Sequence, residues 1–362
     1  MVEKYLLLTP GPLTTSEKVK QAMDFDYCTW DDDYKKITQS FRHSLLELAE
    51  VKEDEYTAVP IQGSGTYGVE SVISSTISDD DTLLIAINGA YGQRISEMAD
   101  VYGINHVDLV VDEREPITLE AVTEYLDKYP DITHFAMIHC ETTTGILNPI
   151  EDIIPYVKEH GIVTIVDAMS SFGGIPIDVK NDKIDYLISS SNKCIQGVPG
   201  FSFVIARKES LESTKGMART LSLDLYSQYI EMERNNGKWR FTSPTHVVHA
   251  FYEALKELNE EGGVKARNQR YQANQKHLAT GMEELGFKVL IDEKWQSPII
   301  TSFIYPTADF DFHKFYQQLK SDGFVIYPGK ISHVPTFRIG NIGEVYDEDI
   351  TNLLQAIKEI IQ

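Results

Sequence analysis

The chain has 362 residues, of which 42% are hydrophobic and 24% are charged, and its formal net charge is −22. This length predicts two domains, or one large domain with a smaller one attached, and the composition is typical of a globular enzyme and not of a disordered chain. A surface this acidic repels nucleic-acid phosphates and anionic lipids, so nucleic-acid and membrane-surface roles are not expected. Any site for an anion must be built locally, from a few cations or backbone N–H groups.

Cysteine, histidine and apolar patterns point to a metal-free cytosolic protein. The three cysteines, Cys28, Cys140 and Cys194, are odd in number and lack C-x-x-C spacing, which favours free thiols in a reducing compartment. His246 and His249 could share a helix face, but no third ligand accompanies them, so no metal site is expected. No apolar run is long enough for a secretory signal or a membrane span. We therefore expect a cytoplasmic enzyme.

Over the first two thirds of the chain, apolar runs alternate with amphipathic stretches. Helices are predicted over residues 34–50, Thr66–Ile77, Leu119–Lys128 and Ile150–His160. Strands are predicted at Tyr56–Ile61, Thr82–Ile87, His106–Val111, Thr133–Ile138, Ile162–Val166, Tyr186–Ser189 and Phe203–Ala206. Short runs of Val, Ile and Leu between helices predict an α/β fold with a mostly parallel central sheet covered on both faces.

The pattern changes after about Pro244. Two long helices are predicted there, followed by a mixture of strands and helices. The predicted elements are helices Thr245–Glu261 and Val264–Leu285, strand Ile299–Ile304, helix Phe312–Ser321, strands Phe324–Tyr327 and Thr336–Ile339, and a helix from Asp347. This order predicts a smaller C-terminal α+β domain. We expect an N-terminal arm at residues 1–15, a large domain at 16–258 and a small domain at 259–362.

A glycine-rich segment, Gly63-Ser64-Gly65-Thr66-Tyr67-Gly68, follows a predicted strand and opens a predicted helix. N-terminal helix N–H groups beside small residues make a phosphate site. The letters also match the G-x-G-x-x-G dinucleotide fingerprint, so a Rossmann dehydrogenase is a competing hypothesis, and a turn without a ligand is another. In a Rossmann unit an acidic residue ends the next strand, whereas Asp79-Asp80-Asp81 precedes the strand Thr82–Ile87.

Two ionisable residues follow strand ends. Asp167 comes directly after the apolar strand Ile162–Val166, and Lys193 comes shortly after the strand Tyr186–Ser189. Ligands of α/β sheets bind beyond the carboxyl ends of strands, where Asp167 would suit a buried cation such as a protonated ring nitrogen. A lysine in apolar or cationic surroundings has a lowered pKa and becomes a usable amine. Alternatively, Asp167 is only a turn cap and Lys193 is a solvated surface charge.

A phosphate cradle, a strand-end carboxylate and a strand-end lysine are together the parts of a pyridoxal phosphate (PLP) site. The cradle would anchor the cofactor, and Asp167 would keep its pyridine nitrogen protonated so that the ring accepts electrons. Lys193 would form a Schiff base with the cofactor and then move a proton. A dehydrogenase has no need for this lysine, so the combination favours a PLP enzyme.

The chain resembles the fold-type I PLP aminotransferases along essentially its whole length. Five segments are similar to the alanine–glyoxylate and serine–pyruvate branch: 8–12 (LTPGP), 88–92 (NGAYG), 141–145 (ETTTG), 166–168 (VDA) and 337–340 (FRIG). Three others are similar to 2-aminoethylphosphonate–pyruvate aminotransferases: 167–174 (DAMSSFGG), 191–200 (SNKCIQGVPG) and 239–246 (WRFTSPTH).

The resemblance implies roles for the cofactor site. Lys193 matches the Schiff-base lysine and Asp167 the partner of the pyridinium nitrogen. Ser64, Gly65 and Thr66 match the phosphate cradle.

It also implies roles around that core. Tyr91 matches an aromatic that stacks on the ring, where the branch often has Trp, and Asn192 occupies a position that is often Gln. Thr143 matches a hydroxyl beside the ring's phenolic oxygen. Thr242 matches a phosphate ligand supplied by the second subunit of a homodimer, and Arg338 matches the clamp on the substrate carboxylate. The changes at Tyr91 and Asn192 bear on substrate identity more than on the chemistry.

The resemblance implies an aminotransferase (transaminase) of phosphonate catabolism. It would move the amino group of 2-aminoethylphosphonate to pyruvate, giving phosphonoacetaldehyde and L-alanine. The nearest alternative is the same fold acting on alanine, serine and glyoxylate or pyruvate. A PLP lyase such as a cysteine desulfurase would need a mobile catalytic cysteine, which the sequence does not indicate. A nonenzymatic binding module would not need both Lys193 and Asp167.

Overall fold

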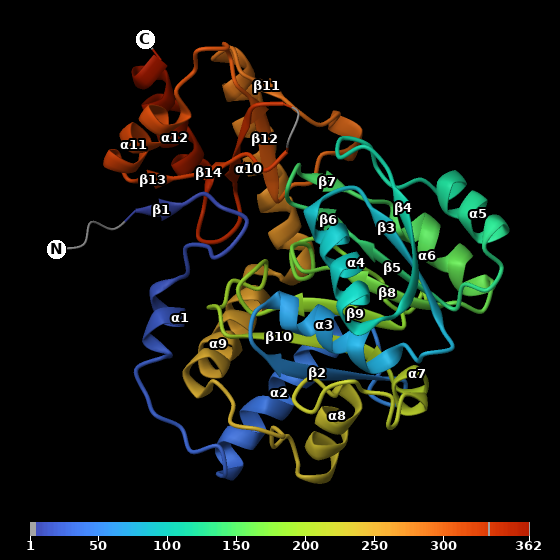
Figure 1. The fold of residues 1–362 in the computed structure, drawn as a ribbon. Coiled ribbons are helices and arrows are strands. Elements are labelled where there is room, and N and C mark those ends of the chain that lie inside the picture. Colours follow the sequence, from blue (N-terminus) through green and yellow to red (C-terminus); the bar gives the residue numbers. More distant parts are fainter. Residues whose placement is uncertain (1–4, 332–333, 362) are drawn as a thin grey trace.

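A seven-stranded sheet forms the centre of the computed structural model, which describes residues 5–331 and 334–361 (Figure 1). Its strand order is β2-β10-β9-β8-β5-β3-β4. All neighbouring pairs are parallel except those of β10, which is antiparallel to β9 and β2. The strands are β2 (Tyr56–Gln62), β3 (Thr82–Ile87), β4 (Asn105–Val110), β5 (His134–Ile138), β8 (Val163–Asp167), β9 (Tyr186–Ser190) and β10 (Phe201–Arg207). The predicted mostly parallel α/β sheet is confirmed.

Helices cover both faces of this sheet because its strands alternate between two apolar cores. On β10, Phe203 and Ile205 point into one core, and Val204 and Ala206 point into the other. The first core packs under α2 (Asp32–Leu48), α5 (Leu119–Lys128), α6 (Ile150–Glu159) and α9 (Thr245–Glu261). The second packs under α3 (Gly65–Thr76), α4 (Ala90–Tyr102), α7 (Lys208–Ser213) and α8 (Leu225–Arg234).

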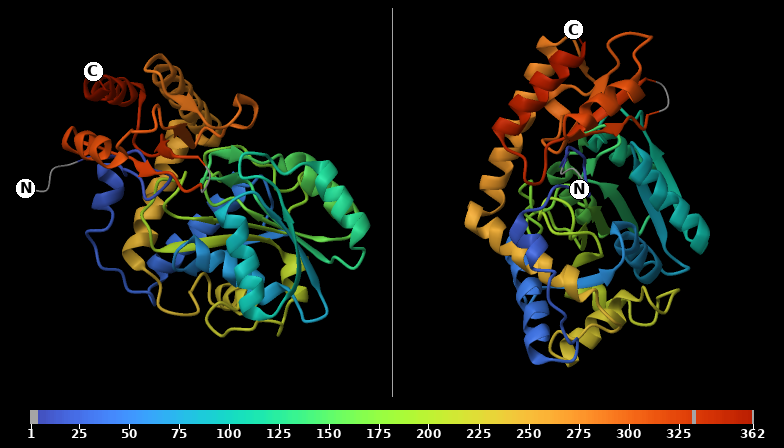
Figure 2. Two further views of the ribbon diagram at one scale, coloured as in Figure 1. Left: turned by 45° about the horizontal axis from the view of Figure 1, so that its top comes forward. Right: turned by 90° about the vertical axis from the view of Figure 1, so that its left-hand side faces the viewer.

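A smaller sheet of order β11-β12-β15-β14 lies toward the end of the molecule that holds α11 and α12 (Figure 1). The long helix α10 runs from the large sheet toward this part (Figure 2). The elements are α10 (Gly263–Glu284), β11 (Lys288–Val289), β12 (Ile300–Ile304), α11 (Phe312–Ser321), β14 (Tyr327–Pro328), β15 (Thr336–Gly340) and α12 (Asp347–Ile361), with a 3-10 turn at Glu293–Trp295. A separate aromatic and aliphatic core joins the small sheet to its helices.

The N-terminal segment crosses to this C-terminal part. Strand β1 (Leu6–Leu7) pairs in parallel with β13 (Phe324–Val325), and Leu8 is buried in the C-terminal core. The single strand predicted at Phe324–Tyr327 is therefore wrong in detail. It is two short strands in different sheets, because β13 pairs with β1 and β14 pairs with β15. The remaining short elements are α1 (Glu17–Gln21), β6 (Cys140–Glu141) and β7 (Ile146–Leu147).

The predicted division at residues 258 and 259 falls inside α9, which ends at Glu261, and Gly262 separates it from α10. The three-part domain organisation stays a prediction, and the first four residues of the predicted arm lie outside the described residues. Within residues 5–331 and 334–361, every helix is too short or too polar to cross a membrane.

Candidate active site

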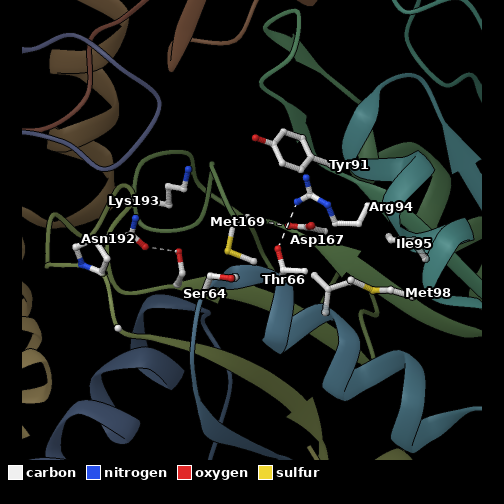
Figure 3. Close-up of a pocket in the computed structure, with 15 residues that line it drawn as sticks. Ser64, Thr66, Tyr91, Arg94, Ile95, Met98, Asp167, Met169, Asn192 and Lys193 are labelled. Carbon is white, nitrogen blue, oxygen red and sulfur yellow. Dashed lines mark hydrogen bonds between the residues drawn. The ribbon is translucent and has the colours of Figure 1, made fainter. Parts of the chain in front are cut away.

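The carboxyl ends of β2, β3, β8 and β9 surround one pocket (Figure 3). Parallel strands bring their carboxyl ends to the same edge of a sheet, and ligands of α/β folds bind there. The pocket collects seven of the residues that the sequence singles out, and it adds others that the sequence does not. Its lining is Ser64, Gly65, Thr66, Val69, Tyr91, Arg94, Ile95, Met98, Asp167, Met169, Ser190, Asn192, Lys193, Pro199 and Gly200.

The N-terminus of α3 faces this pocket. Ser64 is the residue that precedes the helix, and its side chain makes no capping hydrogen bond. Helix N-terminal N–H groups without an intrahelical partner favour an anion. At Gly65 an added Cβ would collide with the sulfur of Met169, so the backbone approaches the pocket as closely as glycine allows. The hydroxyls of Ser64 and Thr66 add two more donors, which together fit a phosphate group.

Asp167 is a buried carboxylate at the end of β8. One of its oxygens, Oδ1, accepts a 2.8 Å hydrogen bond from the backbone N–H of Met169. Burial raises the pKa of Asp167 to about 6, because the charged form loses water. A cation placed beside it would restore the charged form, so the carboxylate fits a protonated ring nitrogen.

Lys193 follows β9 through a short turn and reaches the same pocket. Its Nζ donates a 2.7 Å hydrogen bond to the carbonyl oxygen of Pro10. Burial lowers the pKa of Lys193 to about 8, because the ammonium form loses water. Its neighbour Asn192 lines the pocket and accepts a hydrogen bond from Ser190 at 3.1 Å. A neutral amine is therefore accessible near neutral pH, as nucleophilic attack on an aldehyde requires.

Arg94, which the sequence reasoning did not single out, lies between two predicted site residues (Figure 3). Its guanidinium carbon is 5.1 Å from the ring centroid of Tyr91, and Nη1 donates to Thr66 Oγ1 at 3.3 Å. The sequence could have indicated Arg94 through its spacing. Arg94 follows Tyr91 by three residues, and a helix such as α4 places residues at this spacing on one face.

Thr143 lies outside the lining of the pocket and binds a second missed residue, Glu141. The hydroxyl and the backbone N–H of Thr143 donate to Glu141 Oε1 at 2.6 and 3.0 Å. The other oxygen, Oε2, accepts the backbone N–H of Tyr91 at 3.1 Å. Burial raises the pKa of Glu141. Glu141 therefore ties the loop after β5 to the start of α4 and fixes the position of Tyr91.

Arg338 on β15 is almost fully buried, with 2% of its surface exposed. Its Nε donates to the carbonyl oxygen of Pro328 at 3.0 Å, and Nη1 donates to that of Thr142 at 2.8 Å. These neutral acceptors fix the guanidinium without cancelling its charge. Burial lowers the pKa of Arg338, while the neighbouring Tyr91 and Tyr327 counteract this. Arg338 is not among the residues that line the pocket, but it interacts electrostatically with Tyr91, which is.

Thr242 is the site residue that the structure separates most clearly from the others. It is exposed and lines a different hollow, together with Tyr67 and Phe241. Within one chain it does not reach the lining that contains Ser64 and Thr66.

The two histidines at the start of α9 each contact hydrogen-bond partners within the chain. His246 contacts Asp26 at 3.0 Å, and His249 contacts the hydroxyl of Tyr27 and the carbonyl oxygen of Ala22.

A ligand that engages all these groups needs an anionic phosphate, a carbonyl carbon for the lysine and a basic ring nitrogen for the aspartate. Pyridoxal phosphate combines the three, and the fold and the pocket together define the class of PLP-dependent transferases with a mostly parallel sheet.

Comparison with known proteins agrees. Residues 30–346 match the model of the family described as aminotransferase class-V. A protein of Bacillus cytotoxicus named 2-aminoethylphosphonate–pyruvate transaminase is 59% identical over 98% of this chain and 97% of its own. A protein of Bacillus mycoides with the same name is also 59% identical, with the same coverage. The chain belongs to the class-V aminotransferase family, and its cofactor is PLP.

Solved structures share the fold at lower sequence identity. Ureidoglycine–glyoxylate aminotransferase from Bacillus subtilis superposes with a TM-score of 0.91 at 24% identity, covering 100% of this chain and 94% of that one. Alanine–glyoxylate aminotransferase from Nostoc sp. also gives 0.91 at 24% identity, with coverages of 100% and 96%. The fold class and the family resemblance predicted from the sequence are confirmed.

Proposed function

We propose that this chain transfers the amino group of 2-aminoethylphosphonate to pyruvate, releasing phosphonoacetaldehyde and L-alanine. The observation that carries the proposal is the 59% identity, over nearly the full length, to proteins named for this reaction. Arg338 supports it, because this buried guanidinium donates hydrogen bonds to two neutral carbonyl oxygens, those of Pro328 and Thr142. Arginine donates paired hydrogen bonds equally well to a phosphonate or a carboxylate.

Each site residue has one role in this proposal. Ser64, Gly65 and Thr66 bind the cofactor phosphate, and Asp167 keeps the ring nitrogen protonated. Lys193 holds the cofactor covalently. When bound, the cofactor supplies an electron sink that makes the hydrogen on the donor's amino-bearing carbon acidic.

The remaining residues position the substrates. As the resemblance implies, Tyr91 would stack on the cofactor ring, Thr143 would lie beside its phenolic oxygen, and Asn192 would lie next to the lysine on the substrate side. Arg338 holds the anionic end of each substrate in turn, which places the amino-bearing carbon within reach of Lys193 Nζ. The neutral amine of Lys193 would take the proton from that carbon and pass it to the cofactor, where the amino group would stay while water supplies the oxygen of phosphonoacetaldehyde. In the second half of the cycle the same amine would carry a proton back to the α-carbon, as pyruvate loses its carbonyl oxygen as water and leaves as L-alanine.

We further propose a cytoplasmic homodimer with a shared active site. Thr242 is exposed and lies apart from the pocket of its own chain, as a residue offered to a partner would. In the test, an inactive Lys193→Ala chain is mixed with an inactive Thr242→Ala, Phe241→Ala chain. Mixed dimers should regain part of the activity, because one of their two sites is intact. Verified mixed dimers without activity would rule out the shared site.

The PLP lyase alternative loses support from the positions of the thiols. Cys140 and Cys194 are buried, and burial raises the pKa of each to about 12, so neither is available as a nucleophilic thiolate. Cys28 is exposed but lies outside the pocket lining. The alanine or serine–glyoxylate alternative needs the same site and differs only in the donor.

A donor panel separates these possibilities. The purified, cofactor-loaded protein is mixed in single turnover with 2-aminoethylphosphonate, alanine, serine or cysteine, and the visible absorbance of the cofactor is followed. We expect 2-aminoethylphosphonate to convert the cofactor to its amine form with the largest specificity constant. A larger constant for serine would replace the proposed function by the serine alternative, and sulfide release from cysteine would indicate the lyase.

A further inference from the structure

A group of unpaired cations surrounds the ring of Tyr91, although the chain as a whole is strongly acidic. Lys330 Nζ lies 5.6 Å from the ring centroid, and the Arg94 guanidinium carbon lies 5.1 Å from it. Arg338 also interacts electrostatically with Tyr91. Among the residues that the structure describes, no carboxylate forms an ion pair with any of these three cations, whereas most other arginines of the chain do form one.

Gathering like charges without a counter-ion costs free energy that an anionic ligand recovers. The cost is visible at Lys330, whose pKa is lowered first by burial and then by the positive charges of Arg338 and Arg94. The carboxylate of Glu141 acts on Lys330 in the opposite direction and raises its pKa. Its oxygens, however, already accept hydrogen bonds from Thr143 and Tyr91.

Lys330 is not among the residues that line the pocket, but it lies over Tyr91, which is, and a hairpin holds the backbone beside it. Lys330 follows β14 directly after Gly329, whose N–H donates to the carbonyl oxygen of Thr336 on β15 at 2.9 Å. The same two strands carry Arg338 and the carbonyl oxygen of Pro328 that orients it. Lys330 and Arg338 therefore belong to one hairpin, in which Arg338 is buried opposite Tyr327 and Lys330 is exposed three residues beyond Tyr327.

We propose that Lys330 is a specificity-determining residue that binds the phosphonate of the amino donor together with Arg338, whereas the carboxylate of pyruvate needs Arg338 alone. A phosphonate offers three oxygens and up to two negative charges, and a carboxylate offers two oxygens and one charge. A second cation beside the arginine matches the extra oxygen and the extra charge. This inference rests on the proposed function, because it assigns one group of that function's donor.

The test uses the cofactor-loaded Lys330→Gln enzyme. It compares the single-turnover specificity constants for 2-aminoethylphosphonate and pyruvate. It also measures by calorimetry the dissociation constants of two unreactive ligands, ethylphosphonate and propanoate. We expect about a tenfold loss for both phosphonates, on the scale of one charge-assisted hydrogen bond, and unchanged values for pyruvate and propanoate. Lys330→Arg, which keeps the charge, should restore most of the phosphonate affinity.

Lys128→Gln is the matched control. It removes the same charge from a lysine that also lies over a tyrosine, Tyr129, at 5.1 Å, but on α5 at the outer edge of the large sheet (Figure 1). It should change none of the four values.

An unchanged dissociation constant for ethylphosphonate in Lys330→Gln would overturn the inference, and so would equal losses for ethylphosphonate and propanoate. If the wild-type enzyme accepts no amino group from 2-aminoethylphosphonate yet binds ethylphosphonate through Lys330, the proposed function fails and the phosphonate-binding role of Lys330 stands.

Discussion

Lys193 and Pro10 are 183 positions apart in the sequence, yet Lys193 Nζ donates a 2.7 Å hydrogen bond to the carbonyl oxygen of Pro10. The N-terminal segment therefore forms part of the wall around the lysine. The next residue, Gly11, has a φ of +112°, which favours glycine, and its missing side chain leaves room for the lysine.

Gly11→Ala should disturb the lysine directly. A Cβ at Gly11 would lie 2.7 Å from Cδ and 2.9 Å from Nζ of Lys193. We expect covalent capture of PLP to slow by roughly 10- to 100-fold, the scale of a displaced catalytic group. Gly216→Ala is the control, because Gly216 also has positive φ, +83°, but nothing lies within 4 Å of its added Cβ. It should cost stability alone, about 1–2 kcal/mol. Equal capture rates in the two variants would show that the arm does not constrain Lys193.

The large sheet could be predicted from the sequence because most of its strands, though not the edge strand β4, are buried on both faces. Strand β3 has the predicted bounds, Thr82–Ile87, since an unbroken apolar run between polar turns marks both ends. Strand β10 begins at Phe201, two residues earlier than predicted, because Ser202 interrupts the apolar pattern. The split between β13 and β14 could not be predicted, because it depends on pairing with residues more than 300 positions away.

Lys193 should show its lowered pKa in the pH dependence of cofactor capture. Only the neutral amine attacks an aldehyde, and burial lowers the pKa of Lys193 from 10.5 to about 8. At pH 7 roughly 10% of the amine is then neutral. The capture rate of apoenzyme, measured by borohydride trapping, should rise about tenfold per pH unit below pH 8 and level off above it. Lys193→Ala should trap nothing at this site. A rate that keeps rising to pH 10 would mean that the lysine has its ordinary pKa.

Asp167→Asn should separate cofactor binding from turnover. The phosphate cradle stays intact, so PLP should still bind, but the ring nitrogen loses its charged partner. We expect turnover to fall ~10²-fold or more, as for the loss of an electrostatic stabiliser. Asp182→Asn is a matched control, because burial also raises the pKa of Asp182 to about 6 and this residue lies outside the pocket lining. It should leave turnover unchanged. If Asp167→Asn turns over as fast as this control, Asp167 is only a cap on the turn to Met169.

The site was partly readable from the sequence because its central residues follow strand ends. Asp167 and Lys193 could be paired on that ground alone. Glu141 and Lys330 could not, because Glu141 ends a two-residue strand and Lys330 lies in a loop, so neither belongs to a periodic pattern, and both contact Tyr91 only through tertiary structure. Thr242 stays a prediction based on resemblance, since a single chain contains no partner to which it could contribute.

Arg338→Lys should weaken both substrates, in contrast to the donor-selective effect expected at Lys330. A lysine keeps the charge but loses the planar fork that Pro328 and Thr142 orient through their carbonyl oxygens. Each half-reaction, followed separately by cofactor absorbance, should lose about 1.5–3 kcal/mol in specificity constant, the range for hydrogen bonds to charged groups. The control is Arg42→Lys, another buried arginine bound to a carbonyl oxygen, that of Ala58, but paired with Glu233 away from the pocket. It should affect stability and neither half-reaction. A loss confined to pyruvate would assign the phosphonate to other cations, and no loss in either half-reaction would remove Arg338 from the substrate site.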